Sequence, residues 1–229
     1  MGPFVVSTSL PRSPHTAESG VARLGALLAP PPRGAGPLVR PHDVGGRAAW
    51  HVLVRDGALE VLRGDAAVAA GTPVPPALRA ALLAAELPTG GVLAGRSAAW
   101  VHAGRPAAAL AADCLDVTYP SGGHRPEVWG AGLVWQAPLL RGDTQELGRV
   151  RVTTPLRTVV DVALHVPGDG TAAGLAQVLS DACGLDLDDA ARLLERRARA
   201  VGRPRARAVL DLARSGPPAV LRAAPVGLP

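Results

Sequence analysis

The chain of 229 residues carries a net charge of +5 and contains no lysine, so arginine supplies all 24 of its basic side chains. This length accommodates two domains of modest size, each able to bury a core without metal or disulfide support. The absence of lysine excludes Walker-type phosphate loops, Schiff-base enzymes and Ser-Lys dyads, because each of these needs a lysine amine.

The N-terminal third contains three predicted helices. Residues 1–15 are rich in Pro and Ser without periodicity and predict a disordered tail. From Thr16 apolar residues recur at helical spacing until the prolines at 30–32 end the first helix. Residues 41–44 predict a short second helix that begins with proline, and a third helix is expected over 47–56.

A hairpin follows the third helix. Strands are expected over 59–63 and 66–70, and they flank Gly64-Asp65, a pair suited to a tight turn. Helix, short helix, helix and hairpin is the order of a winged helix-turn-helix, in which the third helix enters the DNA major groove. We therefore predict a winged helix-turn-helix over residues 16–71.

The predicted third helix has a donor face. Arg47, His51 and Arg55 recur at i, i+4 and i+8 and share this face, whereas Trp50 and its apolar neighbours lie on another. The three donors could contact guanine edges or phosphates, and Arg63 beside the hairpin turn could reach the backbone or the minor groove. A solvated helix face would show the same pattern, so both interpretations stay open.

Charge is balanced over the part of this first domain that holds the second helix, the third helix and the hairpin. Residues 36–71 carry four arginines and four acidic residues. DNA affinity comes largely from neutralised phosphates, and most DNA-binding modules are clearly basic. Binding by this domain alone is therefore expected to be weak.

A second domain of α+β type is predicted over residues 75–215, followed by a Pro-rich tail over 216–229. Alternating apolar residues predict a small, mostly antiparallel sheet packed with helices. Thr154 is expected to cap the helix that begins at Pro155 and docks on this sheet. The elements expected are helices 75–86 and 97–102, strands 114–119, 127–136 and 149–153, and helices from 155 and over 171–183, 188–201 and 204–215.

The positive charge is concentrated near the C-terminus. Residues 165–191 carry five aspartates and no arginine, whereas residues 192–229 carry nine arginines and two acids. Arg203, Arg205 and Arg207 fall in the first turn of the last predicted helix, where cations oppose the helix dipole. They are candidate contacts for nucleic acid or an acidic partner, with plain solvation as the alternative. Tight DNA binding would need these arginines, or a second copy of the chain, beside the third helix.

Motifs of catalysis are not found in the sequence. HExxH, CxxC, GxSxG and GxGxxG motifs are absent, and Cys114 and Cys183 lie too far apart in sequence to suggest a metal site. A metal-dependent nuclease would need clustered carboxylates, for which Asp113, Asp116 and Glu127 are the nearest set. We therefore expect no enzyme activity, no catalytic residue, no cofactor and no metal. Neither a leader peptide nor a membrane-length apolar run is found, so a cytoplasmic protein without a membrane partner is expected.

Four stretches of sequence carry a family resemblance. They are LVRPHDV (38–44) together with LVRDGALEVLRG (53–64), RSAAWVH (96–102), LDVTYP (115–120) and TTPLRTVVDVA (153–163). In this order and at this spacing they resemble the AbiEi-type antitoxin family in its actinobacterial form, from about residue 20 to 214. The last stretch is similar to the helix start TSPARTLLDLA of that family.

The resemblance implies a bipartite regulator of a toxin-antitoxin system. The winged helix would bind a double-stranded operator and repress transcription of its own operon, and the second domain would neutralise a toxin of nucleotidyltransferase type. The wing departs from the family pattern, because Glu60, Asp65 and alanines stand where a basic run ending in tyrosine is common. An alternative is therefore a protein-interaction module whose helix-turn-helix is vestigial and binds no operator.

Overall fold

The computed structural model describes residues 37–104, 107, 115–123, 132–197 and 200–216. The chain divides into two compact units, unit 1 (Met1–Thr72) and unit 2 (Pro73–Pro229). Both helices and strands occur, so the prediction of a mixed α+β chain is confirmed. The predicted N-terminal tail and first helix lie outside the described residues, as does the predicted Pro-rich tail beyond residue 216.

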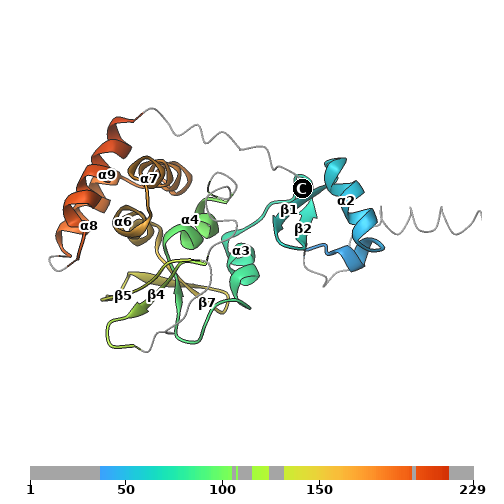
Figure 1. The fold of residues 1–229 in the computed structure, drawn as a ribbon, viewed down its shortest axis with the longest axis horizontal. Helices are drawn as coiled ribbons and strands as arrows, with labels where there is room; N and C mark the ends of the chain where they lie inside the picture. The colour runs from blue at the N-terminus through green and yellow to red at the C-terminus, as the bar shows by residue number, and fades with distance from the viewer. Residues whose placement is uncertain (1–36, 105–106, 108–114, 124–131, 198–199, 217–229) are drawn as a thin grey trace, which may run out of the picture. The chain divides into compact units, whose positions relative to one another are not determined.

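Unit 1 contains the short helix, the longer helix and the hairpin that the sequence predicts, each within a residue or so of its expected bounds. These elements are the 3-10 helix η1 (Pro41–Val44), α2 (Arg47–Arg55), β1 (Leu59–Arg63) and β2 (Ala66–Ala69) (Figure 1). Gly45 and Gly46 separate the two helices with φ angles of 90° and 105°, which side chains rarely adopt. The chain before η1 also joins the hairpin, because the amide of Val39 donates to the carbonyl of Ala67 at 2.7 Å.

A small core attaches α2 to the hairpin. Trp50 of α2 is buried with Leu59 of β1 and Ala67 of β2, and four partly buried side chains pack around them: Val39, Val44, Leu53 and Val54. The predicted apolar face of the helix is therefore confirmed. Its expected partner, the first helix, lies outside the described residues.

Unit 2 consists of helices and one five-stranded sheet. The elements in chain order are α3 (Pro76–Leu83), β3 (Val92–Leu93), α4 (Gly95–Ala103), β4 (Val117–Pro120), β5 (Val134–Ala137), β6 (Thr144–Leu147), β7 (Val150–Thr153), α6 (Pro155–His165), α7 (Asp169–Cys183), α8 (Leu187–Glu195) and α9 (Arg203–Ser215). Strands β3 and β6 were not expected from the sequence, and α8 ends at Glu195, before the predicted Val201.

The sheet is mixed, so the prediction of a mostly antiparallel sheet is wrong. Its strand order is β5-β4-β3-β7-β6. The pairs β3–β4 and β6–β7 are antiparallel, whereas β3–β7 and β4–β5 are parallel. The reason is the short strand β3 at the centre, whose two residues show no alternation in the sequence and which pairs with strands of both directions.

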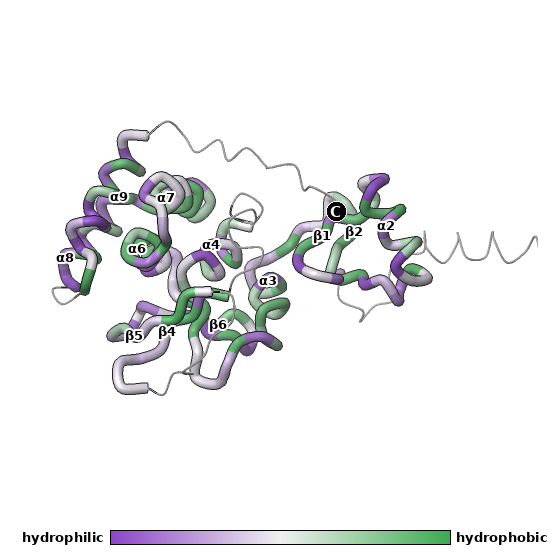
Figure 2. The backbone as a smooth tube through the Cα atoms, in the orientation of Figure 1, coloured by the Kyte–Doolittle hydropathy of each residue, from purple (hydrophilic) through white to green (hydrophobic). Residues whose placement is uncertain are grey.

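Helix α6 lies at the centre of unit 2. It contacts α4, α7, α8 and α9, and Val159, Val160 and Val162 are fully buried. Helices α4 and α6 lie between the sheet and the outer helices (Figure 1). Hydrophilic residues are frequent along α8 and α9 (Figure 2), as expected for helices at the surface. The hydroxyl of Thr154 does not cap the amides of α6 as predicted, because it donates to the carbonyl of Gly142 at 3.2 Å.

A buried ion network joins α6 to the loop after β5 and to the end of α8. Arg157, whose side chain is 4% exposed, pairs with Asp161 one turn later at 2.9 Å and with Asp143 at 3.1 Å. Asp143 also accepts from Arg197, just past the end of α8. Both guanidinium groups donate to the carbonyl of Pro138. We call these four charged residues (Arg157, Asp161, Asp143 and Arg197) the arginine network.

Removing one partner of the arginine network should be costly, because the charges left behind stay buried. We expect Arg157→Ala to lower the free energy of unfolding by about 3–5 kcal/mol in urea denaturation. Arg192→Ala is the matched control, since Arg192 pairs with Asp189 at the exposed surface, where an ion pair contributes about 0.5 kcal/mol or less. Equal losses in the two variants would contradict a structural role for the network.

Candidate nucleic-acid interface

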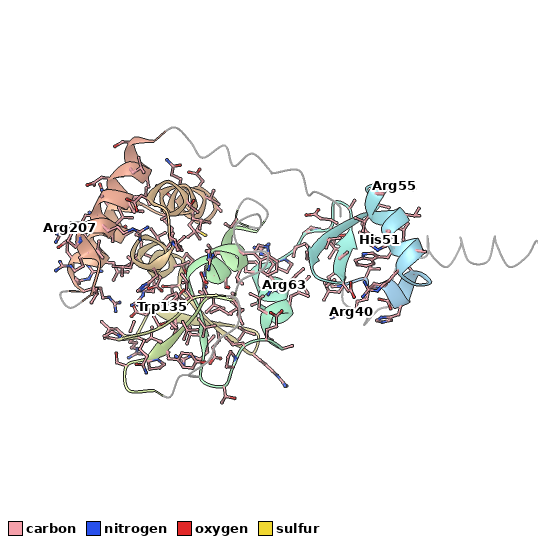
Figure 3. The ribbon with its side chains drawn as sticks, viewed as in Figure 1. Arg40, His51, Arg55, Arg63, Trp135 and Arg207 are labelled. Atoms are coloured by element: carbon pink, nitrogen blue, oxygen red, sulfur yellow. The ribbon has the colours of Figure 1, made fainter. Side chains whose placement is uncertain are left out.

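The three predicted donors of α2 lie on its exposed face. Arg47, His51 and Arg55 are all exposed, while Trp50 between them is buried. The labelled side chains of His51 and Arg55 extend from this helix in Figure 3. The imidazole of His51 makes no ion pair or hydrogen bond with any other described residue. This face therefore presents two guanidinium groups and one imidazole within two helical turns.

Both arginines of this face have a carboxylate beside them. Arg47 donates to Asp65 in the hairpin turn at 3.0 Å, and the two side chains are 73% and 48% exposed. Arg55 donates to Asp56 at 3.1 Å. Exposed ion pairs of this kind contribute about 0–1 kcal/mol. Phosphate groups can therefore replace these carboxylates at low cost, although the carboxylates remain competitors.

The remaining candidate of unit 1, Arg63, lies at the end of β1 and is half-buried. Sequence reasoning did not single out Arg40, which precedes η1 and is exposed (Figure 3). The sequence signal for it was a fourth arginine within the same domain. Arg40 adds a cation to unit 1, but Asp43 accepts from its backbone amide at 2.8 Å and lies beside it.

The three candidates of the last helix are engaged within unit 2. Arg203 and Arg207 donate to the same carboxylate, that of Glu195, at 2.5 and 2.6 Å. Hydrogen bonding from Arg207, with the charges of both arginines, lowers the pKa of Glu195 to about 2. This carboxylate therefore stays ionised throughout the physiological pH range and holds both guanidinium groups.

Arg205 binds the C-terminal end of α6. Its guanidinium donates to the carbonyls of Ala163, Leu164 and Val166, at 3.2, 3.4 and 2.7 Å, and to Asp169 at 2.8 Å. The last carbonyls of a helix lack partners within the helix and carry a partial negative charge. A cation that is unfavourable at the start of α9 is thus favourable here, because its charged group lies at the end of another helix.

This placement predicts that Arg205 matters more for stability than Arg207. We expect Arg205→Ala to lower the free energy of unfolding by about 1–3 kcal/mol, because several carbonyls lose a charged donor. Arg207→Ala serves as the control, since this half-exposed side chain pairs only with Glu195 among the described residues, and we expect it to cost at most about 1 kcal/mol. The assay is urea denaturation, and indistinguishable midpoints would argue against the capping role.

The carboxylate that a metal-dependent nuclease would use, Asp116, is fully buried and already paired. It accepts from the side chain of Arg96 at 2.7 and 2.9 Å, from the backbone amide of Arg96 at 2.9 Å and from that of Leu133 at 2.9 Å. Its proposed companions Asp113 and Glu127 lie outside the described residues. In the part of the chain that the structure describes, no group of three or more His, Cys, Asp or Glu is arranged to hold a metal ion.

His165, at the last turn of α6, is stacked on Trp135 of β5 with ring centroids 4.3 Å apart. Burial, together with the positive charges of Arg157 and Arg205, lowers the pKa of His165 to about 4. The imidazole is therefore neutral at physiological pH. In the same helix, burial raises the pKa of Asp161 to about 6 despite the nearby charge of Arg157.

The depressed pKa of His165 predicts a pH dependence of stability. In the unfolded chain His165 has its ordinary pKa of about 6.5, whereas in the folded chain its pKa is about 4. Between these two pH values only the unfolded chain binds a proton at this residue. Stability due to neutral His165 is thus complete above pH 6.5 and is lost as the pH falls toward 4. Relative to His165→Gln, the native protein should lose about 2 kcal/mol of unfolding free energy between pH 7.5 and 5.0.

Urea denaturation of both proteins at the two pH values measures this loss. Asp161 is common to both proteins, so its own titration largely cancels in the difference. A gap between the two proteins that stays constant with pH would contradict the neutral buried imidazole.

Comparison with known proteins adds no family to this description, since no protein-family model matches the chain and no curated protein sequence matches it significantly. Among the described residues, no helix is both long enough and apolar enough to span a membrane.

Proposed function

We propose that unit 1 is a winged helix-turn-helix that binds double-stranded DNA, with α2 as the recognition helix and the β1–β2 hairpin as the wing. The observation that carries the proposal is the division of α2 into two faces. Trp50 attaches one face to the hairpin, while Arg47, His51 and Arg55 are presented on the other. A rigid helix with outward guanidinium groups fits the width of the major groove and its guanine acceptors.

The chain as a whole would then act as a transcriptional regulator of its own operon, like the antitoxins it resembles. Unit 2 would supply the contact with a protein toxin. The arginines of α9 have acidic or carbonyl partners inside unit 2, so we assign them to the structure of this unit. Contacts with DNA are assigned to unit 1.

The test is a gel-shift titration with a DNA fragment from immediately upstream of its own gene, at several salt concentrations. Each neutralised phosphate contributes about −0.9 to the slope of log affinity against log salt. If Arg47 and Arg55 both neutralise phosphates, the double variant Arg47→Ala/Arg55→Ala should make the slope shallower by about 2 and lose affinity at every salt concentration. Arg149→Ala is the control, because this exposed residue of unit 2 pairs with no other described residue.

A second variant tests the same interface through an expected gain of DNA affinity. Asp65→Asn removes the carboxylate that competes with phosphate for Arg47, so it should tighten DNA binding by up to about fivefold. The fold should tolerate this change, because Asp65 is exposed in a turn. Failure of the native protein and of Asp65→Asn to shift any DNA at low salt would refute the proposal.

The balanced charge of residues 36–71 favours a second candidate, a protein-interaction module that binds no operator. Under this hypothesis the native chain leaves DNA unshifted at low salt but forms a stoichiometric complex with the product of the adjacent gene, measured by co-purification. Loss of that complex in unit 2 surface variants that keep the fold, but not in Arg47→Ala/Arg55→Ala, would assign the protein contact to unit 2.

A further inference from the structure

A cavity of about 470 Å³ lies in unit 2. Three parts of unit 2 line it: the end of β5 with the loop after it, one side of α6, and residues 196–197 and 200–201 between α8 and α9. Its volume falls within the range of small-molecule sites, about 300–1,000 Å³. All of its walls belong to one compact unit, so the cavity does not depend on how the two units are arranged.

The charged side chains that line the cavity are all positive. Among the described residues that line it are three arginines but no aspartate or glutamate, and the lining histidine, His165, is neutral at physiological pH. The carboxylates of the arginine network, Asp143 and Asp161, lie behind the wall and hold Arg157 and Arg197 in place. A fixed pair of guanidinium groups facing a concave, partly apolar space is an arrangement suited to oxyanions.

These arginines also retain unused donors. Arg157 donates through Nε and Nη1, and its Nη2 has no hydrogen-bond partner among the described residues. Arg196 stands beside them, exposed and with no ion pair in the described part of the chain. Guanidinium donors that have no partner within the protein can form charge-assisted hydrogen bonds with an oxyanion that enters the cavity.

The rest of the wall is apolar. Val160 and Leu164 of α6 supply its inner part, and two unusually exposed hydrophobic side chains, Leu140 and Val201, stand at its edge with 61% and 90% of their surface exposed. Burial of such side chains by a ligand is favourable in proportion to the apolar area removed from water. The cavity thus combines an inner end lined by guanidinium groups with an apolar rim.

We propose that this cavity is a binding site for a small organic anion, with one oxyanion group that faces Arg157, Arg196 and Arg197 and a compact apolar body that packs against Leu140 and Val201. The oxyanion is a carboxylate or a phosphate monoester, which share this chemistry. The proposal is independent of DNA binding, because none of the residues it uses belongs to unit 1.

The experiment is calorimetric titration of the full chain with four probes: 2-naphthoate, 2-naphthyl phosphate, the neutral analogue 2-naphthalenemethanol and inorganic phosphate. We expect at least one of the two naphthyl anions to bind tenfold or more tightly than the neutral analogue and than inorganic phosphate. The tighter of the two anions identifies the headgroup. Equal binding of the neutral analogue, or no heat from either naphthyl anion at millimolar concentration, would overturn the proposal.

Variants at exposed positions test the residues without endangering the fold. Arg196→Gln should weaken binding of the preferred anion by about tenfold, as expected for the loss of one charged hydrogen bond, and leave the affinity for the neutral analogue unchanged. Val201→Ser should weaken the naphthyl anions while leaving inorganic phosphate unaffected. Arg141→Gln is the control, because this exposed arginine follows Leu140 in sequence but does not line the cavity. Equal weakening by Arg141→Gln and Arg196→Gln would also overturn the proposal.

Discussion

The structure of unit 2 depends on the arginine network. Arg157 projects from the central helix into the fold, and its guanidinium joins α6 to the loop after β5 through Asp143 and the carbonyl of Pro138. Arg197 reaches the same two acceptors from the far end of α8. Desolvation makes such a cluster expensive, and the ion pairs and hydrogen bonds within it offset part of that cost. The network therefore fixes where the loop and α8 can lie relative to α6.

Arginine side chains also donate hydrogen bonds to the unpaired carbonyls at the C-terminal ends of two helices in unit 2. Arg205 of α9 caps the carbonyls of α6, and Arg79 of α3 donates to the last carbonyls of α4, those of Val101 and His102, at 2.8 and 3.2 Å. The planar guanidinium can serve several carbonyls at once, which an ammonium group does less well. In a chain without lysine, a large part of the positive charge is thus used inside the fold.

The segregation of charge along the sequence has the same explanation. The acidic stretch 165–191 and the arginine-rich stretch that follows it fold onto one another, as the pairs Asp169–Arg205 and Asp188–Arg214 show. The two segments of opposite charge therefore form helices that pack against one another. The C-terminal excess of arginine is thus not by itself evidence of a nucleic-acid partner. The exposed face of α2 remains the better candidate for that role.

Local signals predicted most elements of the fold, because they depend on residues close in sequence. The glycine pair at 45–46, Pro155 and the Gly64-Asp65 turn placed helices and the hairpin within a residue or two. Strand β3 has too few residues to show a period, and β6 is a polar edge strand, so neither could be recognised.

Long-range partners of charged residues could not be predicted in the same way. The i, i+4 spacing of Arg157 and Asp161 was visible, but nothing in it indicates burial or the approach of Asp143 and Arg197. From the sequence, Arg205 lies at the start of its own helix, where the helix dipole disfavours a cation. In the fold its guanidinium contacts a carbonyl 41 residues away in sequence, that of Leu164.

One consequence concerns acid. At the junction of α8 and α9 the surface carboxylate Glu195 has a pKa of about 2 and is held by two guanidinium groups that never lose their protons. Inside unit 2, by contrast, Asp161 and His165 have pKa values of about 6 and about 4. Between pH 6 and pH 4 these two interior groups take up protons, while Glu195 and its two arginines keep their charges. Acidification therefore protonates Asp161 and His165 in the core around α6 before it removes any charge at this junction.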